Sequence, residues 1–112
     1  MKKSRRITFN VDIYNCTVHV FYGTEYKEYG KYIKKLTGYG EFMEEVSAGR
    51  CIRTPCRNIF IWTNKRKHSL LAHEIFHAAE NILEACDIKL TDESTEAYAY
   101  LIEMITRKVL GS

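Results

Sequence analysis

The sequence is poor in proline and glycine, with one proline and six glycines in 112 residues. It contains no Gly- or Pro-rich linker, no internal repeat and no low-complexity segment, so collagen-like and disordered architectures are excluded. Hydrophobic residues make up 46% of the chain and charged residues 28%, which are ordinary values for a globular domain. We therefore expect residues 1–112 to form a single domain with one modest core.

Long apolar stretches are also absent. No run approaches the roughly 18 residues of a membrane-spanning helix, so we expect no membrane partner. The basic residues at positions 1–6 precede a segment, residues 7–13, that alternates apolar and polar side chains and is therefore not a secretory signal. We expect a cytoplasmic protein, including one that acts in a phage-infected or prophage-bearing host cell.

The four cysteines do not form a zinc-ribbon pattern. Cys51 and Cys56 are separated by four residues, and Cys16 and Cys86 supply no second pair at ligand spacing. The first pair would suit a metal or a small loop disulfide, but reduced thiols are the ordinary state in a cytoplasmic protein. We predict that Cys51 and Cys56 are free and contribute nothing to metal binding.

Charge is unevenly distributed along the chain. Residues 1–67 carry 14 basic and 6 acidic side chains, whereas residues 68–112 carry 3 basic and 8 acidic ones. Such polarity is typical of a nucleic-acid-binding face on the first part. A domain whose acidic half is attracted to its own basic half, or to a bound cation, has the same distribution.

The apolar pattern predicts an α+β fold, with a short mixed or antiparallel sheet and a backing helix, followed by two C-terminal helices. Alternation and β-propensity predict strands at residues 7–13, 18–22, 41–52 and 58–63. Helical spacing and capping residues predict helices at residues 25–36, 69–86 and 91–110. We expect the helices to pack on one face of the sheet, with the last two joined by residues 87–90.

One motif contains residues typical of a metal site, the H-E-x-x-H pattern His73-Glu74-Ile75-Phe76-His77 inside a predicted helix. The two histidines are about 40° apart around the helix axis, so both imidazoles can meet one metal ion. Glu74 lies about 100° from His73, where it can reach a metal-bound water without being a ligand. A plain amphipathic helix with a polar stripe would show the same spacing.

A third ligand is available on the next helix. A catalytic zinc takes three protein ligands and keeps one position open. Glu96 lies 19 positions after His77, and a chain reversing through a four-residue connection would bring the first turns of the last helix back beside the motif. We predict Glu96 rather than Glu93, because Glu93 is closer to the fraying N-terminus and can serve the helix dipole there.

H-E-x-x-H followed by Glu96-Ala97 on the next helix resembles the gluzincin branch of the zincin metallopeptidases. The sequence around these motifs is similar to that of small metallopeptidase-like proteins of phages and prophages, and the match covers about residues 58–105. The resemblance implies a zincin-like domain with one Zn²⁺ ion, held by His73, His77 and Glu96. It also implies that Glu74 is the general base of peptide hydrolysis.

The resemblance assigns further roles. The strand ahead of the active helix pairs with extended substrate in that family, which implies this role for Ile59, Phe60 and Ile61. Larger gluzincins often have an acid four residues after the ligand glutamate, and this chain has Tyr100 there. The candidates for stabilising the oxyanion, or for supporting a ligand from behind, are Tyr100, Tyr39 and His68.

Three functional hypotheses follow. The first is a zinc-dependent peptidase acting on a protein or peptide substrate, with a cleft completed by the chain itself, a homodimer or a partner protein. The second is a non-catalytic interaction protein in which zinc joins two helices. The third is a nucleic-acid-associated module, or merely a solvated basic face, formed by Lys2, Lys3, Arg5, Arg6, Arg50, Arg53, Arg57, Lys65, Arg66 and Lys67.

Overall fold

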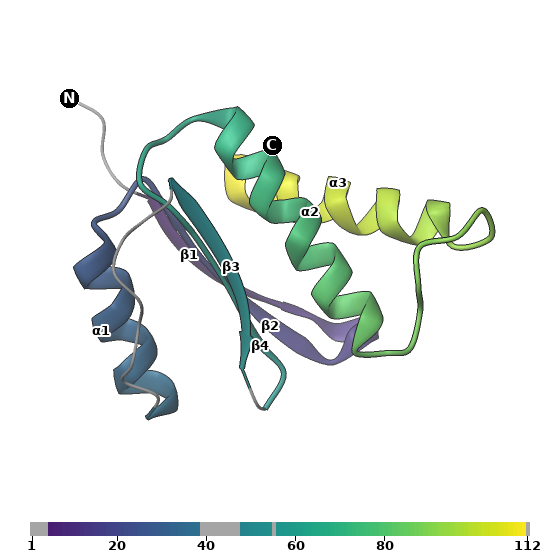
Figure 1. The fold of residues 1–112 in the computed structure, drawn as a ribbon, viewed down its shortest axis with the longest axis horizontal. Helices are drawn as coiled ribbons and strands as arrows, with labels where there is room; N and C mark the ends of the chain where they lie inside the picture. The colour runs from purple at the N-terminus through teal and green to yellow at the C-terminus, as the bar shows by residue number, and fades with distance from the viewer. Residues whose placement is uncertain (1–4, 39–47, 55, 112) are drawn as a thin grey trace.

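A four-stranded mixed sheet forms the centre of the structure, a computed structural model that describes residues 5–38, 48–54 and 56–111. Its strands are β1 (Arg5–Val11), β2 (Cys16–Tyr22), β3 (Gly49–Thr54) and β4 (Asn58–Thr63). The order across the sheet is β1-β2-β4-β3 (Figure 1). The β1–β2 and β3–β4 pairs are antiparallel, whereas β2 and β4 run parallel. The predicted α+β fold with a short mixed sheet is confirmed.

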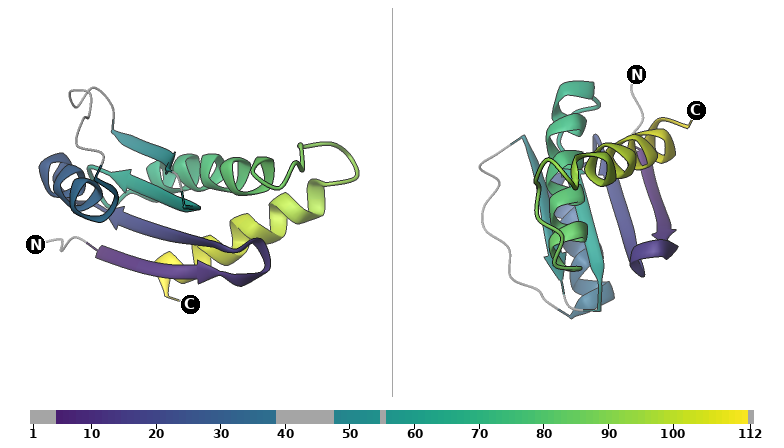
Figure 2. Two further views of the ribbon diagram at one scale, coloured as in Figure 1. Left: turned by 90° about the horizontal axis from the view of Figure 1, so that it is seen from below. Right: turned by 90° about the vertical axis from the view of Figure 1, so that its right-hand side faces the viewer.

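Three α-helices in the described part of the chain cover the sheet on both faces: α1 (Tyr26–Thr37), α2 (His68–Glu84) and α3 (Thr95–Leu110). A short 3-10 helix, Asp12–Tyr14, joins β1 to β2. Figure 1 shows α1 on one side of the sheet and α2 and α3 on the other. The turned views in Figure 2 show the same arrangement. The expectation that all helices pack on one face was therefore wrong. None of the described helices is both long and apolar enough to cross a membrane.

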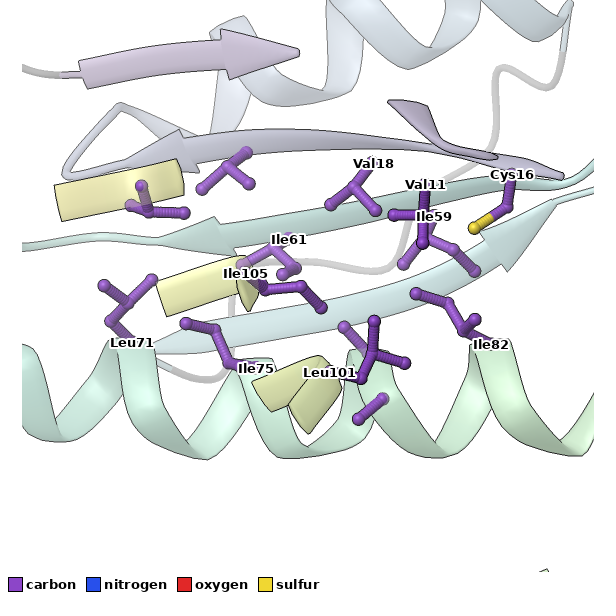
Figure 3. Packing of buried hydrophobic residues seen from close by; sticks show 14 of the residues in the cluster. Val11, Cys16, Val18, Ile59, Ile61, Leu71, Ile75, Ile82, Leu101 and Ile105 are labelled. Carbon is purple, nitrogen blue, oxygen red and sulfur yellow. The ribbon is translucent and has the colours of Figure 1, made fainter. Parts of the chain in front are cut away.

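The inner strands β2 and β4 explain the two-sided packing, because successive side chains of a strand point to opposite faces. On β4, Ile59 and Ile61 belong to the cluster under α2 and α3, while Phe60 and Trp62 belong to the cluster under α1. All four are at most 1% exposed. Figure 3 shows the first cluster, in which strand residues meet Leu71, Ile75, Ile82, Leu101 and Ile105 from the helices.

The connection between α2 and α3 is longer than predicted. Residues 85–94 join the helices, and α3 begins at Thr95 rather than at residue 91. The Thr91 backbone N–H donates a 2.9 Å hydrogen bond to the Ser94 hydroxyl, and the Thr95 hydroxyl donates a 2.8 Å bond to the Thr91 carbonyl. Such local bonds from hydroxyl side chains compete with helix formation, so the helix starts one turn later.

Candidate metal centre

A groove of about 540 Å³ lies between β3 and the outer side of α2. The H-E-x-x-H motif lies beside the sheet in this groove. His73, Glu74 and His77 all face it, because their spacing along α2 places them on this side of the helix. The residues that line the groove are Gly49, Arg50, Cys51, Ile52, His73, Glu74, His77, Glu80, Asn81 and Glu84.

The two histidines lie close together on α2. Their ring centroids are 4.8 Å apart with the ring planes at 74°. Since a zinc–imidazole bond is about 2.0–2.1 Å long, rings this close can meet at one ion. His77 Nδ1 also lies 2.9 Å from Glu80 Oε1, which leaves His77 Nε2 available. A carboxylate behind a histidine is the usual support of a zinc ligand, so the pair fits two positions of a zinc site.

Glu74 differs from the other carboxylates of the groove because it is buried. Its residue is only 7% exposed, and its carboxylate lies under the start of β3, where Gly49 packs against it. Burial raises the pKa of the Glu74 carboxyl above its ordinary value, while the nearby His73, His77 and Arg50 oppose this shift. The side chain is therefore a buried carboxylate that is more basic than it would be in water.

Glu96 does not share this groove. It lies exposed in the first turn of α3, on the helix face opposite Tyr98, Leu101 and Ile105, which are buried in the core. Within residues 5–38, 48–54 and 56–111, no group of three His, Cys, Asp or Glu side chains is arranged to hold a metal ion. The structure thus brings together His73, Glu74 and His77 but not the predicted third ligand.

The remaining candidates for the oxyanion or supporting role lie elsewhere. Tyr100 is 74% exposed on α3 and does not line the groove. His68 is exposed at the first residue of α2, one turn before the motif, and does not line the groove either. Tyr39 lies outside the described residues.

The predicted substrate strand is an inner strand, which corrects its assignment. β4 is hydrogen-bonded to β2 on one side and to β3 on the other, and Ile59, Phe60 and Ile61 are buried. A strand paired on both sides has no free backbone groups for an added peptide. The edge strand of the described sheet beside α2 is β3, which overlaps the end of the strand predicted at residues 41–52. Residues 41–47 of that prediction lie outside the described residues.

The chain matches no protein-family model, no curated protein and no solved structure. The chemistry of the groove is therefore the basis for inferring a function.

Sequence reasoning missed the contribution of β3 to the groove. Gly49, Arg50 and Cys51 reach it only because β3 is at the sheet edge next to α2, which no local pattern reveals. Glu80 and Glu84 continue the polar stripe of the histidines, so their position was predictable from helical spacing.

The cysteines are free thiols, as predicted. Cys51 nevertheless lies in β3 and lines the groove, where Asn81 Nδ2 donates a 3.6 Å hydrogen bond to its sulfur. Burial raises the pKa of the Cys51 thiol to about 12. A thiol with so high a pKa is protonated at neutral pH and is a weak nucleophile.

Proposed function

We propose that the protein is a zinc-dependent peptidase with His73 and His77 as metal ligands, Glu96 as the third ligand and Glu74 as the general base. The observation that carries this proposal is the arrangement of the α2 side chains. Two imidazoles and one buried carboxylate converge on one groove beside an edge strand. A plain amphipathic helix explains an exposed His73 and a half-buried His77, but it does not explain why Glu74, next to His73, is buried.

Zinc in this position would supply a Lewis acid that polarises the scissile carbonyl and activates water. The protein's own part is proton transfer. Glu74 accepts the proton of the attacking water and passes it to the leaving amine. The raised pKa of Glu74 suits both steps, because a base works best when its pKa approaches the working pH. Glu80 keeps the His77 ring in one orientation through its 2.9 Å contact.

The third ligand is the part of the proposal that requires a change in the position of a side chain. Glu96 would have to extend from the outer face of α3 towards the histidines on α2. Two carboxylates are closer alternatives, because Glu80 and Glu84 already line the groove. Each of the three can be replaced separately, so the choice among them is open to experiment.

The Glu74→Gln variant tests the function. Gln keeps the size of the side chain and removes only its proton-accepting charge, so fold and zinc content are expected to stay unchanged. Cleavage of a peptide library is expected to fall about 10²–10⁴-fold. Glu93→Gln, in the exposed connection before α3, is the matched control and retains activity. Cleavage that survives Glu74→Gln, or wild-type protein that fails to bind zinc at micromolar concentration, would reject the proposal.

A separate groove favours a second function, nucleic-acid binding. It has a volume of about 690 Å³ and lies between α1 and the first strands, on the opposite face of the sheet from α2. Arg6, Lys31 and Lys35 line it with a single acid, Glu28. The Arg6 guanidinium lies 4.7 Å from the centre of the Tyr32 ring. A cationic groove with an aromatic wall suits a single strand.

A short single-stranded oligonucleotide tests this second function. Binding that weakens steeply with salt, and that is lost in Arg6→Ala, would support it. Absence of binding at low salt would remove it, without affecting the peptidase proposal.

A further inference from the structure

Gly49, the first residue of β3, lies directly against the Glu74 side chain. A Cβ atom added at Gly49 would lie 2.8 Å from Glu74 Oε2 and 3.1 Å from Glu74 Cγ. The same atom would lie 3.2 Å from the Trp62 carbonyl oxygen. Real Cβ atoms essentially never come within 3.0 Å of a heavy atom outside their own residue and its chain neighbours, so any side chain at this position would force a neighbour to move.

The backbone does not explain a glycine here. Gly49 is not among the glycines with positive φ, which in the described part of the chain are Gly23, Gly38 and Gly111. It pairs with Thr63 in the regular β3–β4 ladder. Glycine weakens a strand because it loses more backbone entropy on folding than other residues do. A residue with a side chain would therefore suit the strand better at position 49. Glu74, however, occupies the space that such a side chain would need.

We propose that Gly49 is a positioning residue for Glu74: its missing side chain lets the carboxylate lie beneath the edge strand while still facing the groove. The inference rests on the proposed role of Glu74 as the general base. The position of the Glu74 carboxylate relative to the two histidines would then be determined by its packing against β3, rather than by a hydrogen-bond partner on α2.

The neighbours of Gly49 determine which atoms would move. The Trp62 carbonyl belongs to the backbone of β4, which is held by pairing on both sides. The Glu74 carboxylate is the far end of a flexible side chain, so it is the group that gives way. A displacement of about 1 Å in a catalytic group can reduce a rate by about 10²-fold. The Gly49→Ala variant should therefore fold and bind zinc but hold its base in the wrong place.

Thermal unfolding tests the contact without any need for activity. Gly49→Ala is expected to lower Tm in the wild-type background, where the new methyl group meets Glu74. In a Glu74→Ala background both contacts with Glu74 are gone and only the 3.2 Å contact with the Trp62 carbonyl oxygen remains, so the same change is expected to lower Tm less or not at all. Equal Tm shifts in the two backgrounds would overturn the proposal.

Kinetics tests the positioning role itself. Gly49→Ala is expected to lower kcat about 10- to 100-fold, with KM and zinc content close to those of the wild type. In a Glu74→Gln background it should produce no further loss, because no base is left to misplace. Gly30→Ala, which adds the same methyl group on α1 across the sheet, is the matched control and should leave kcat unchanged.

The two measurements separate failure of this inference from failure of the proposed function. A wild-type protein without hydrolytic activity would refute the peptidase and the positioning role together, while the Tm comparison would still decide the contact. An active wild type whose kcat is unaffected by Gly49→Ala, or falls equally with and without the Glu74 carboxylate, would refute only the role of Gly49.

Discussion

His77 Nδ1 lies 2.9 Å from Glu80 Oε1, on the next turn of α2. The two side chains are 45% and 33% exposed, so water competes with the contact and its ionic contribution to stability is small. Its effect on orientation is different. A histidine whose Nδ1 is engaged presents Nε2 to any other partner, and here that nitrogen belongs to a ring that faces the groove.

Removing this support should weaken zinc binding. Glu80→Ala is expected to lower the zinc affinity about 10- to 100-fold, because the His77 ring loses the partner that fixes its orientation. Competition with a chelating dye measures the change, and Glu93→Ala is the control. An unchanged affinity would mean that the His77–Glu80 contact is only a surface pair.

The third ligand can be identified by comparing four carboxylates. We expect Glu96→Gln to weaken zinc binding much more than Glu93→Gln. Gln is a poor zinc ligand, and of these two carboxylates only Glu96 is proposed to contact the ion. Zinc stoichiometry and affinity measured side by side give the answer. If Glu84→Gln causes a larger loss than Glu96→Gln, the site is built on α2 alone and the assignment of Glu96 is wrong. Glu80→Gln is compared through zinc stoichiometry, because loss of its contact with His77 lowers affinity even where Glu80 is not a ligand.

A buried histidine makes stability depend on pH. His19 is 4% exposed, lies 2.9 Å from Asn58 Oδ1 and stacks on Phe60. Burial lowers its pKa below the ordinary 6.5, and the Asn58 bond opposes this only in part. The unfolded chain therefore binds a proton at a pH where the folded protein does not. The free energy of unfolding should fall as pH drops below about 6.5 and level off below the folded pKa.

Urea unfolding at a series of pH values measures this dependence. His19→Phe should flatten the slope in this window, since phenylalanine cannot bind a proton. A slope that is the same in both proteins would place its origin in other groups.

Two buried tyrosines should respond in opposite ways to loss of the hydroxyl. The Tyr29 hydroxyl is buried without a hydrogen-bond partner among the described residues, so Tyr29→Phe should raise the free energy of unfolding by about 1 kcal/mol. The Tyr98 hydroxyl donates a 3.0 Å bond to the Ile88 carbonyl, so Tyr98→Phe should lower it by about 1 kcal/mol. Urea unfolding of both variants tests the pair, and shifts of the same sign would contradict it.

The fold was predictable where the sequence signal is local. Alternation located β1 and β2, and helical spacing located α1 and α2. The placement of helices on both faces was also encoded, because the unbroken apolar run from Ile59 to Trp62 is typical of a strand buried on two sides. We predicted the strand at residues 58–63, but not that helices would cover both of its faces. The late start of α3 depends on side-chain bonds around Ser94, which compete closely with helix formation.

The candidate site divides in the same way. His73, Glu74 and His77 lie on one helix, so their grouping follows from 3.6 residues per turn. The contact between Gly49 and Glu74 joins two elements, and it depends on how β3 aligns with α2 across the groove. No periodicity in the sequence specifies such an alignment. The prediction of Glu96 relied on a short connection between α2 and α3, and the observed connection spans residues 85–94.

The parallel pairing of β2 with β4 has a consequence for the order of folding. The two strands of each antiparallel pair are close in sequence. The pairing of β2 with β4, in contrast, brings together residues far apart in the chain, such as Thr17 and Asn58. Closing so long a loop is entropically unfavourable, so this junction should form late. Residues 49–84 hold β3, β4 and α2, and therefore every wall of the groove. The segment that holds the two histidines and Glu74 should thus start to fold as one unit, before β1 and β2 pack against it.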